Sequence, residues 1–355
     1  MAITTSSADP DLALAEIIAQ ANTSLDASDH VVSGEVDTVF SWDYAPTRDP
    51  LTRLYVKGRR AQWDAEDLPW DTDVDQERLA MAEAALMGGF AAGADLSGTA
   101  FADWGTREWV ALSVESQNWM LSQFLHGEQG ALLCTAKLAQ TVPYMEAKYC
   151  AATQALDEAR HVEVFARYLD DKLSGHYQIN AHLGALLDDI ITEPRWDITY
   201  LGMQVLVEGT ALAAFGLIRQ ITDEPLLSEL LRRVMTDEAR HVAFGVISLS
   251  EFYEGLSAAE IEERQQFALE ATVRIRDRFA MQEVWERLGT PVAEATRLVA
   301  QMPERAIFQQ LLFSKIVPNC SKLGLLDAGD GWLRKQFTDM GIIGFEQAPV
   351  EEEDA

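Results

Sequence analysis

The hexapeptide Asp-Glu-Ala-Arg-His-Val stands at residues 157–162 and again at residues 237–242, eighty positions later. Six identical residues at two places in one chain indicate an internal repeat, which is the first feature to interpret in a new sequence. Each copy holds a Glu-x-x-His pair: Glu158 with His161, and Glu238 with His241. On an α-helix, positions i and i+3 lie on one face, so both side chains of a pair can reach one metal ion.

A further glutamate precedes each copy of the repeat. Glu128 stands thirty residues before Glu158, and Glu208 stands thirty residues before Glu238. Both lie in otherwise apolar helical faces, where a carboxylate is costly unless it is paired or bound to a metal. The equal spacing predicts two similar units, each with a glutamate on one helix and a Glu-x-x-His pair on the next.

Helix-breaking residues lie at the midpoint of each thirty-residue interval. Pro143 is midway in the first, and Asp223, beside Pro225, is midway in the second. Proline favours the first position of a helix and disfavours the helix before it. At about 1.5 Å rise per residue, each glutamate lies roughly 20 Å from its turn, so antiparallel packing sets the two glutamates of a unit side by side. Two such hairpins, joined by a long crossover through about 174–196, can pack into one bundle.

The bundle would bring six metal-ligand candidates to one interior point. They are Glu128, Glu158, His161, Glu208, Glu238 and His241. Four carboxylates and two imidazoles suit iron or manganese, and bridging carboxylates partly neutralise two dications. The alternative is a buried ion-pair network that holds no metal.

The charged neighbours of these candidates are repeated as well. Asp157 and Asp237 precede the glutamates of the repeat, and Arg160 and Arg240 precede its histidines. A metal-bound histidine needs its second ring N–H held, usually by a carboxylate. We expect each aspartate to serve the histidine of the opposite hairpin and the arginines to balance the aspartates. The alternative is that these four charges point to solvent.

The doubled Asp-Glu-x-Arg-His, with a glutamate thirty residues before each copy, resembles the ferritin-like non-haem diiron carboxylate oxygenase superfamily. The repeat is similar to that of the bacterial multicomponent monooxygenases and, more loosely, of the soluble acyl carrier protein desaturases. The resemblance covers about residues 106–254. It implies an all-α, ferritin-like four-helix bundle with a long crossover and additional flanking helices.

The same resemblance implies a function. Two iron ions, with Mn/Fe as the alternative, would activate O2 as co-substrate and oxidise a small organic substrate by hydroxylation, N-oxygenation or desaturation. The substrate pocket would lie about one turn from the ligands. Its candidate residues are Phe124, Leu132, Thr135, Gln204, Ala211, Leu212 and Phe215, each of which has ordinary bundle core as the alternative interpretation.

Three positions depart from particular relatives. Val234 stands where similar arylamine N-oxygenases carry an extra histidine, and Leu212 stands where the monooxygenases carry a threonine. Phe165 takes the place of the tyrosine usual four residues after the first ligand histidine in radical-generating ribonucleotide reductase subunits. Two alternative functions are a partner subunit of that kind and a ferritin-like iron store. Phe165 disfavours the first, and a chain about twice the size that one bundle needs disfavours the second.

Composition excludes several other classes of protein. The formal net charge of the 355 residues is −29, which repels nucleic acid and anionic membranes. The three cysteines are scattered without a Cys-x-x-Cys pair, which argues against a disulfide framework or a zinc ribbon and favours a reducing cytoplasm. The first ten residues lack the features of a secretory signal, and no uninterrupted apolar run approaches the length of a membrane span. We expect a soluble, cytoplasmic protein.

A diiron oxygenase needs electrons, and no ferredoxin-like or flavin-binding segment is apparent in the sequence. We therefore expect a separate electron donor, a ferredoxin or a reductase, unless the substrate itself supplies the electrons. So acidic a surface repels an acidic carrier unless a basic patch receives it. The candidate patch is Arg53, Lys57, Arg59 and Arg60, with a few solvated charges as the alternative. The sequence leaves the oligomeric state open, with a homodimer through the extra helices as one candidate.

Helical periodicity predicts long helices at about 106–139, 144–173, 197–221 and 225–254, and others at about 74–91, 258–288, 292–301 and 304–315. Residues 31–75 are predicted to be irregular, with Trp42, Trp63 and Trp70 fixing them to the body, and residues 11–22 to form a short amphipathic helix. The expected domains are a partly disordered tail at 1–30, a single helical domain at 31–345 and an acidic disordered tail at 346–355.

Overall fold

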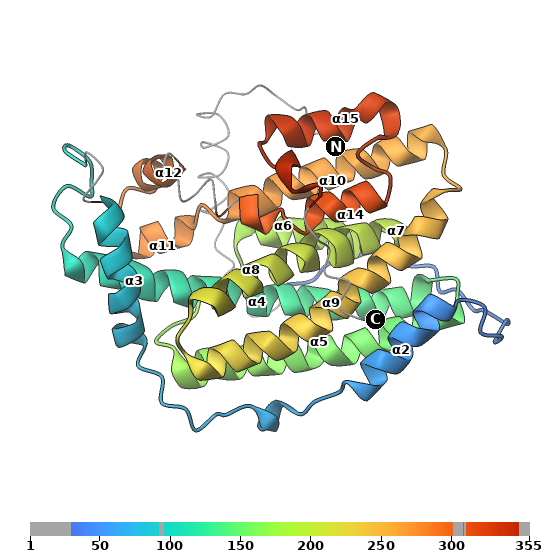
Figure 1. The fold of residues 1–355 in the computed structure, drawn as a ribbon, viewed down its shortest axis with the longest axis horizontal. Coiled ribbons are helices and arrows are strands. Elements are labelled where there is room, and N and C mark those ends of the chain that lie inside the picture. Colours follow the sequence, from blue (N-terminus) through green and yellow to red (C-terminus); the bar gives the residue numbers. More distant parts are fainter. Residues whose placement is uncertain (1–29, 92–95, 301–307, 309, 348–355) are drawn as a thin grey trace.

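The computed structural model describes residues 30–91, 96–300, 308 and 310–347, and all regular structure within these ranges is helical (Figure 1). The all-α prediction is confirmed. The short helix expected at 11–22 and most of the two expected tails lie outside the described residues. Near the described end of the chain, Glu346 accepts hydrogen bonds from Arg334 and Ser321.

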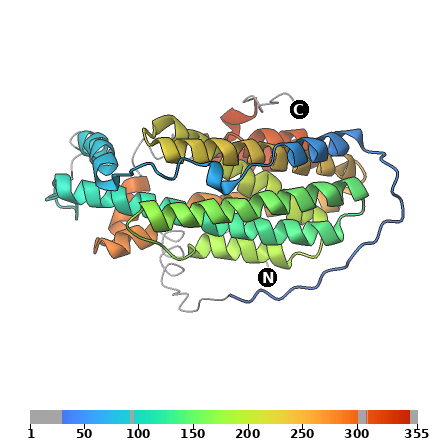
Figure 2. The same cartoon turned by 90° about the horizontal axis from the view of Figure 1, so that it is seen from below.

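Two helical hairpins form the centre of the molecule, as the repeat predicts. Helix α4 (Thr106–Thr141) is followed by α5 (Met145–Lys172), and α8 (Glu208–Ile221) is followed by α9 (Pro225–Tyr253). Pro143 lies in the first turn, and Pro225 begins α9 after Glu224, whose carboxylate caps the helix by accepting from two backbone N–H groups. The two antiparallel pairs pack side by side into one bundle (Figures 1 and 2).

The helical run that carries Glu208 is not a uniform α-helix. It starts as α7 (Trp196–Tyr200), continues as a π-helical segment η2 (Leu201–Val207), and becomes α8 at Glu208. A glycine on α9 permits close approach here, because a Cβ atom at Gly245 would lie 2.6 Å from Cβ of Gln204. π-Turns inside α-helices are frequent at functional sites. The wider turn therefore sets the position of Glu208 against α9.

The crossover between the hairpins contains a helix that the sequence analysis did not predict, α6 (Ala181–Thr192). Asn180 caps its first turn by accepting from the N–H groups of two following residues. Its last carbonyls accept from the buried ammonium of Lys137 on α4 at 2.8–3.0 Å. This lysine fastens the crossover to the bundle, because a cation at a helix C-terminus satisfies the orphan carbonyls.

Helix α2 (Asp49–Arg60) contradicts the prediction that 31–75 is irregular. Pro50 in the first turn and the buried Leu51 and Leu54 are the signals of this helix, whose apolar side lies across α5 and α9. A short 3-10 turn η1 (Ala65–Asp67) follows it. Trp63 and Trp70 pack against the core as predicted. Trp42 does not, since 78% of its surface is exposed.

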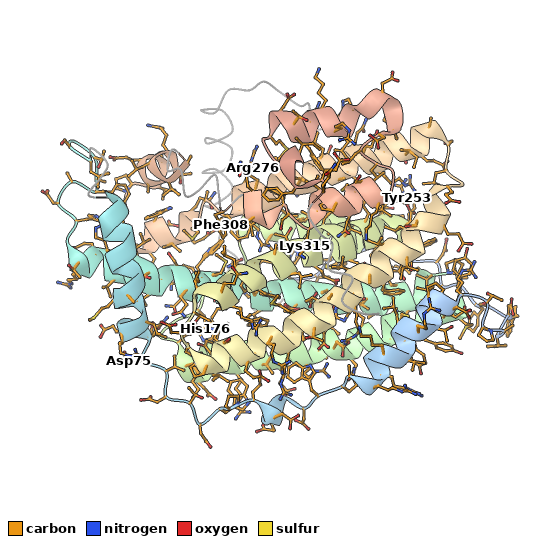
Figure 3. All side chains as sticks on the ribbon, in the orientation of Figure 1. Asp75, His176, Tyr253, Arg276, Phe308 and Lys315 are labelled. Carbon is orange, nitrogen blue, oxygen red and sulfur yellow. The ribbon has the colours of Figure 1, made fainter. Side chains whose placement is uncertain are left out.

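The remaining helices flank the bundle. Helix α3 (Gln76–Ala91) packs on the start of α4, and α10 (Ala258–Arg278) packs on α6, η2 and α15 (Ala328–Asp339). The other elements are α11 (Gln282–Arg287), α12 (Val292–Ala300), α14 (Ile316–Lys322) and η3 (Ile343–Phe345). Side chains fill the space between these layers (Figure 3).

The helix predicted at 258–288 is broken after Arg278. Met281 adopts a left-handed backbone conformation with φ of 51°, and the buried Phe279 packs against Trp119 of α4, so the chain turns to bury this ring. Of the helix expected at 304–315, residues 304–307 and 309 lie outside the described residues, 308 and 310–312 are helical, and 313–315 form a turn.

One stretch of the described residues, Trp196–Ile221, is long and apolar enough to cross a membrane by length and composition alone. Inside the protein, 61% of its most apolar window is buried, and the core helices of soluble proteins pass the same test.

Candidate metal centre

Six side chains from all four bundle helices meet in the interior. The ligand atoms of Glu128, Glu158, His161 and Glu238 lie within 4.8 Å of one another, and so do those of Glu158, Glu208, Glu238 and His241. All six residues are buried, with at most 5% of their surface exposed. The structure therefore brings together the complete set of ligand candidates that the sequence repeat singled out.

The two groups share Glu158 and Glu238, the glutamates of the repeated hexapeptide. Glu128 and His161 belong to one group only, and Glu208 and His241 belong to the other. The arrangement has two adjacent positions for cations, each with one glutamate and one histidine of its own. The two shared carboxylates lie where they can bridge these positions, as bridging carboxylates do in dimetal sites.

Each histidine directs one ring nitrogen to the glutamates. Nδ1 of His161 lies 3.1–3.3 Å from oxygens of Glu128, Glu158 and Glu238. Nδ1 of His241 lies 3.0 Å from Glu158 and 3.6 Å from Glu238. Because α5 and α9 each place the histidine one turn after the glutamate, both imidazoles face the same interior point.

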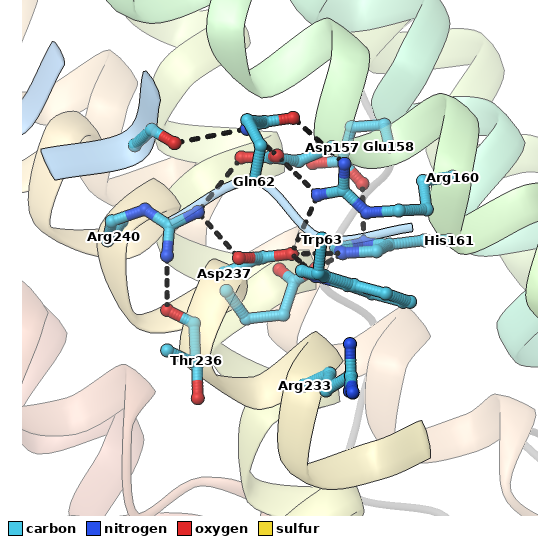
Figure 4. A network of polar contacts seen from close by, with 12 residues as sticks. Gln62, Trp63, Asp157, Glu158, Arg160, His161, Arg233, Thr236, Asp237 and Arg240 are labelled. Atoms are coloured by element: carbon cyan, nitrogen blue, oxygen red, sulfur yellow. Dashed lines mark hydrogen bonds and ion pairs between the residues drawn. The ribbon is translucent and has the colours of Figure 1, made fainter. Parts of the chain in front are cut away.

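The other ring nitrogen of each histidine meets an aspartate of the opposite hairpin, and Figure 4 shows this contact for His161 and Asp237. Nε2 of His161 lies 3.2 Å from Oδ2 of Asp237, and Nε2 of His241 lies 3.3 Å from Oδ2 of Asp157. If each Nε2–H donates to its aspartate, the Nδ1 lone pair is free to bind a cation. This crossed pairing is the one that we expected from the sequence.

Two arginines complete the crossed pairing. Arg160 donates to Asp157 at 2.6 Å and to Asp237 at 3.1 Å, and Arg240 donates to Asp237 at 2.6 Å and to Asp157 at 3.0 Å. Two positive and two negative groups, all buried, thus neutralise one another. Removing one member of such a set is strongly destabilising because it leaves an uncompensated charge.

Two residues after α2 join this network, and the sequence analysis did not assign them a role in it. Gln62 donates to Asp157 at 2.7 Å and accepts from Arg160 at 2.9 Å. The indole N–H of Trp63 donates to Asp237 at 2.8 Å, and its ring lies under the Arg160 guanidinium at 4.5 Å. Both residues come from a segment remote in sequence, so no spacing rule pointed to them (Figure 4).

Gln154 is a further residue that sequence reasoning missed. Its amide donates to Glu158 at 3.0 Å and to Glu208 at 2.7 Å. It lies one turn before Glu158 on α5, so its position on the ligand face was readable from the sequence. These two hydrogen bonds link Glu158, which belongs to both ligand groups, with Glu208, which belongs to one.

The packing of carboxylates raises the pKa of two of them. Burial raises the pKa of Glu128 to about 8, and the nearby Glu238 adds to the shift. Burial likewise raises the pKa of Glu208 well above its usual range, with Glu238 and Glu158 adding to it. Burial also acts to raise the pKa of Glu158, but His241 and His161 outweigh it and the pKa is lowered.

The histidines and aspartates shift in the opposite sense to an isolated buried group. Burial acts to lower the pKa of His161, but Asp237 and the glutamates outweigh it and raise that pKa well above its usual value. Burial also acts to lower the pKa of His241, but Glu158 and Glu238 outweigh it, so that this pKa is likewise raised well above its usual value. The pKa of Asp237 is lowered because its bond to His161 outweighs the effect of burial. These directions favour neutral Glu128 and Glu208 and protonated histidines at the centre when no metal ion is bound.

The donor set fits two cations. One oxygen each of Glu158 and Glu208 and both oxygens of Glu238 are buried without a hydrogen-bond partner among the described residues, and only the imidazoles of the two candidate ligand histidines lie within ion-pair distance of those of Glu158 and Glu238. Unpaired buried acceptors are costly, and metal ions satisfy them. Oxygen and imidazole ligands without thiolates suit iron or manganese.

The residues expected to line a substrate pocket lie around this centre with different degrees of burial. Phe124, Thr135, Gln204 and Phe215 are buried, whereas Leu132, Ala211 and Leu212 are partly exposed. Phe124, Phe165 and Phe215 form a cluster with ring centroids 4.7–6.1 Å apart. The Thr135 hydroxyl and both polar atoms of the Gln204 amide have no hydrogen-bond partner in the described part of the chain. The assignment of these seven residues to a pocket stays a prediction.

Comparison with known proteins supports the fold. No protein-family model matches the chain. The structure is similar to that of an R2-like ligand-binding oxidase with an aerobically reconstituted metal cofactor after photoconversion, at 16% sequence identity over 78% of this chain and 94% of that one, with a TM-score of 0.52. Two mutants of R2-like ligand-binding oxidase, reconstituted with Mn/Fe, match at 17% identity and the same coverage, with TM-scores of 0.52 and 0.51.

The chain therefore has the ferritin-like helical fold of the R2-like proteins, and the predicted fold class is confirmed. The similarity covers 78% of the chain and so extends beyond residues 106–254, to which the sequence resemblance was limited.

We predict that Asp237→Asn weakens metal binding about 10–100-fold, because the amide no longer holds the Nε2–H of His161 with a full charge. Dissociation constants from competition with a chelator would measure the effect. Asp73→Asn, at an exposed position, is the control and should bind metal like the unaltered protein. An unchanged affinity in Asp237→Asn would show that this aspartate does not support a ligand.

We also predict that metal binding releases protons at neutral pH. Glu128 has a pKa of about 8, and the pKa values of Glu208 and both histidines are raised, so these groups carry protons that a cation must displace. Affinity should therefore fall as the pH is lowered from about 8. Calorimetry in buffers of different ionisation enthalpy counts the protons, and Glu128→Gln should release fewer. Metal binding at pH 7 without proton release would contradict the prediction.

Proposed function

We propose that this protein is an O2-activating dimetal oxidoreductase that oxidises a small organic substrate. The observation that carries the proposal is the pair of overlapping ligand groups, Glu128, Glu158, His161 and Glu238 with Glu158, Glu208, Glu238 and His241, buried inside the bundle. Two iron ions, or one manganese and one iron, would supply the redox chemistry needed to reduce dioxygen. Hydroxylation, N-oxygenation and desaturation are the candidate outcomes for the substrate.

The protein's own groups would perform three tasks at this centre. Glu158 and Glu238, which belong to both ligand groups, would help to hold both ions. Asp237 and Asp157 would fix the orientation of the imidazoles through the Nε2 contacts. The surrounding core would exclude bulk water, because the six ligand candidates are buried and the aromatic cluster of Phe124, Phe165 and Phe215 packs beside them.

The comparisons support an oxidase over the two alternative functions. The solved structures with similar folds are described as ligand-binding oxidases, some of them with Mn/Fe cofactors. Phe165 has no hydroxyl with which to hold a tyrosyl radical beside the ligands, which disfavours a radical-storing partner subunit. The additional helices and the crossed Asp–Arg network favour a fixed catalytic centre over a transient site of iron storage.

Loss of one ligand should abolish the activity without unfolding the bundle. We predict that His161→Ala and Glu238→Ala each lose at least one metal ion per chain and all O2 consumption by the reduced protein. Helical content by circular dichroism should be largely kept, since the hairpins pack over a long interface outside the centre. Full activity in either variant would refute the ligand assignment.

Metal content after aerobic loading tests the class of function. We expect two metal ions per chain, because the described residues offer two overlapping ligand groups. Elemental analysis of protein loaded with excess iron, and then freed of unbound metal, measures the number. Hundreds of iron atoms per assembly would indicate storage, and none would remove the proposed function.

A further inference from the structure

A basic surface covers the outer side of α2 in this strongly acidic protein. Four of the 28 lysines and arginines, Arg53, Lys57, Arg59 and Arg60, lie within eight residues of a chain whose net charge is −29. Arg53, Arg59 and Arg60 are exposed, and no ion pair joins these three to a carboxylate within the described ranges. We call the four residues the basic surface.

Aromatic and apolar side chains of the adjoining helix border the basic surface. The Arg59 guanidinium lies 5.6 Å from the ring of Tyr55 on α2, and that ring packs at a tilt against Tyr149 of α5, with the ring centroids 5.3 Å apart. Tyr149 is 41% exposed, and Leu156, further along α5, is 57% exposed. Arginine and tyrosine are enriched where proteins bind one another, and exposed apolar groups between them favour contact over hydration.

The end of α2 connects this surface to the metal centre. Arg60 is followed within three residues by Gln62 and Trp63, which donate to Asp157 and Asp237. These aspartates contact the Nε2 atoms of the two ligand histidines. A protein bound on the basic surface would therefore lie at the outer end of a short, hydrogen-bonded connection to the centre (Figure 4).

We infer that the basic surface is the docking site of a small acidic one-electron carrier, of the ferredoxin or flavodoxin class. The inference rests on the proposed function, which requires electrons from outside the chain. Charge complementarity selects the carrier: an acidic protein is repelled by most of this molecule and attracted here, so its encounters are directed to α2. A docked carrier would give up one electron, and the two metal ions that the six ligand candidates would hold would accept one electron each from two such encounters.

An acyl carrier protein is also acidic, but the surroundings of the basic surface do not suit it. Its prosthetic arm would need an opening that leads to the metal centre. The hollow on α2, of about 480 Å³, is lined by α2 and the residue after it: Thr52, Arg53, Val56, Lys57, Arg60 and Ala61. None of these is a ligand candidate or a predicted pocket residue, so the surface favours electron delivery over substrate delivery.

The test compares two charge-reversal variants in the metal-loaded full chain. Arg53→Glu/Arg60→Glu alters the basic surface, and Arg107→Glu/Lys335→Glu reverses the same number of exposed charges on α4 and α15, away from α2 (Figure 1). The probes are an acidic plant-type [2Fe–2S] ferredoxin and a flavodoxin, with affinities from calorimetry and reduction rates from stopped-flow absorbance.

At low salt, at least one probe should bind the unaltered protein and the control alike, and the variant on the basic surface about tenfold or more weakly. Binding to the unaltered protein should weaken as salt is added, because screening shortens the range of attraction. Dithionite, a small reductant that needs no docking surface, should reduce the metal centre equally in all three proteins.

An acyl carrier protein is added to the same assays as the competing acidic partner. Three results would overturn the inference: equal affinities for the variant and the control, no binding of the ferredoxin or the flavodoxin at low salt, or binding on the basic surface by the acyl carrier protein alone. If the dithionite-reduced, metal-loaded protein consumes O2, the proposed function stands under any of these three results. If the unaltered, metal-loaded protein consumes no O2 after reduction with dithionite, that result would instead count against the proposed function.

Discussion

The rest of the structure depends on one electrostatic constraint, the gathering of four carboxylates at one dry interior point. Glu128, Glu158, Glu208 and Glu238 lie so close together that their charges cannot all exist there without compensation. The raised pKa values of Glu128, Glu208 and the two histidines favour bound protons as this compensation when no cation is present. Two dications would provide the same charge and satisfy the unpaired oxygens, so the costly arrangement is explained by binding and not by stability.

The layers outside the ligands follow from that constraint. A histidine bound by a cation needs its far nitrogen held, and the aspartates that hold it need arginines, because each is itself buried. Gln62 and Trp63 close this network on its outer side. The helix before them is thus fixed to the centre, and a surface feature of α2 is linked to the ligands through a few hydrogen bonds.

The sequence was sufficient for the bundle and the ligand candidates because both obey helical spacing. The repeat and the prolines near residues 143 and 225 determined the two hairpins, and the i, i+3 spacing determined which side chains face inward. Helix α2 was missed, although Pro50 and the spacing of Leu51 and Leu54 signalled it, because four basic residues masked its apolar side. Gln62 was not predictable from spacing, since its bond to Asp157 spans 95 positions and depends on tertiary packing. The π-helical segment before Glu208 likewise depends on close packing against Gly245.

The repeat makes the two halves alike in chemistry, yet their surroundings differ. On one side, Glu128 comes from an uninterrupted α-helix, and the aspartate that holds His161 accepts from the Trp63 indole. On the other, Glu208 follows a π-helical segment and accepts from Gln154, and the aspartate that holds His241 accepts from the Gln62 amide. A hydrogen bond to a carboxylate withdraws negative charge from it and so weakens its interaction with the histidine or cation that it contacts. The local helix geometry sets how far the glutamate side chain extends toward the centre. Because both features differ between the two halves, the two cation positions are inequivalent. Such a centre can give two identical ions different potentials, or select a different ion for each position, from an almost identical set of ligands.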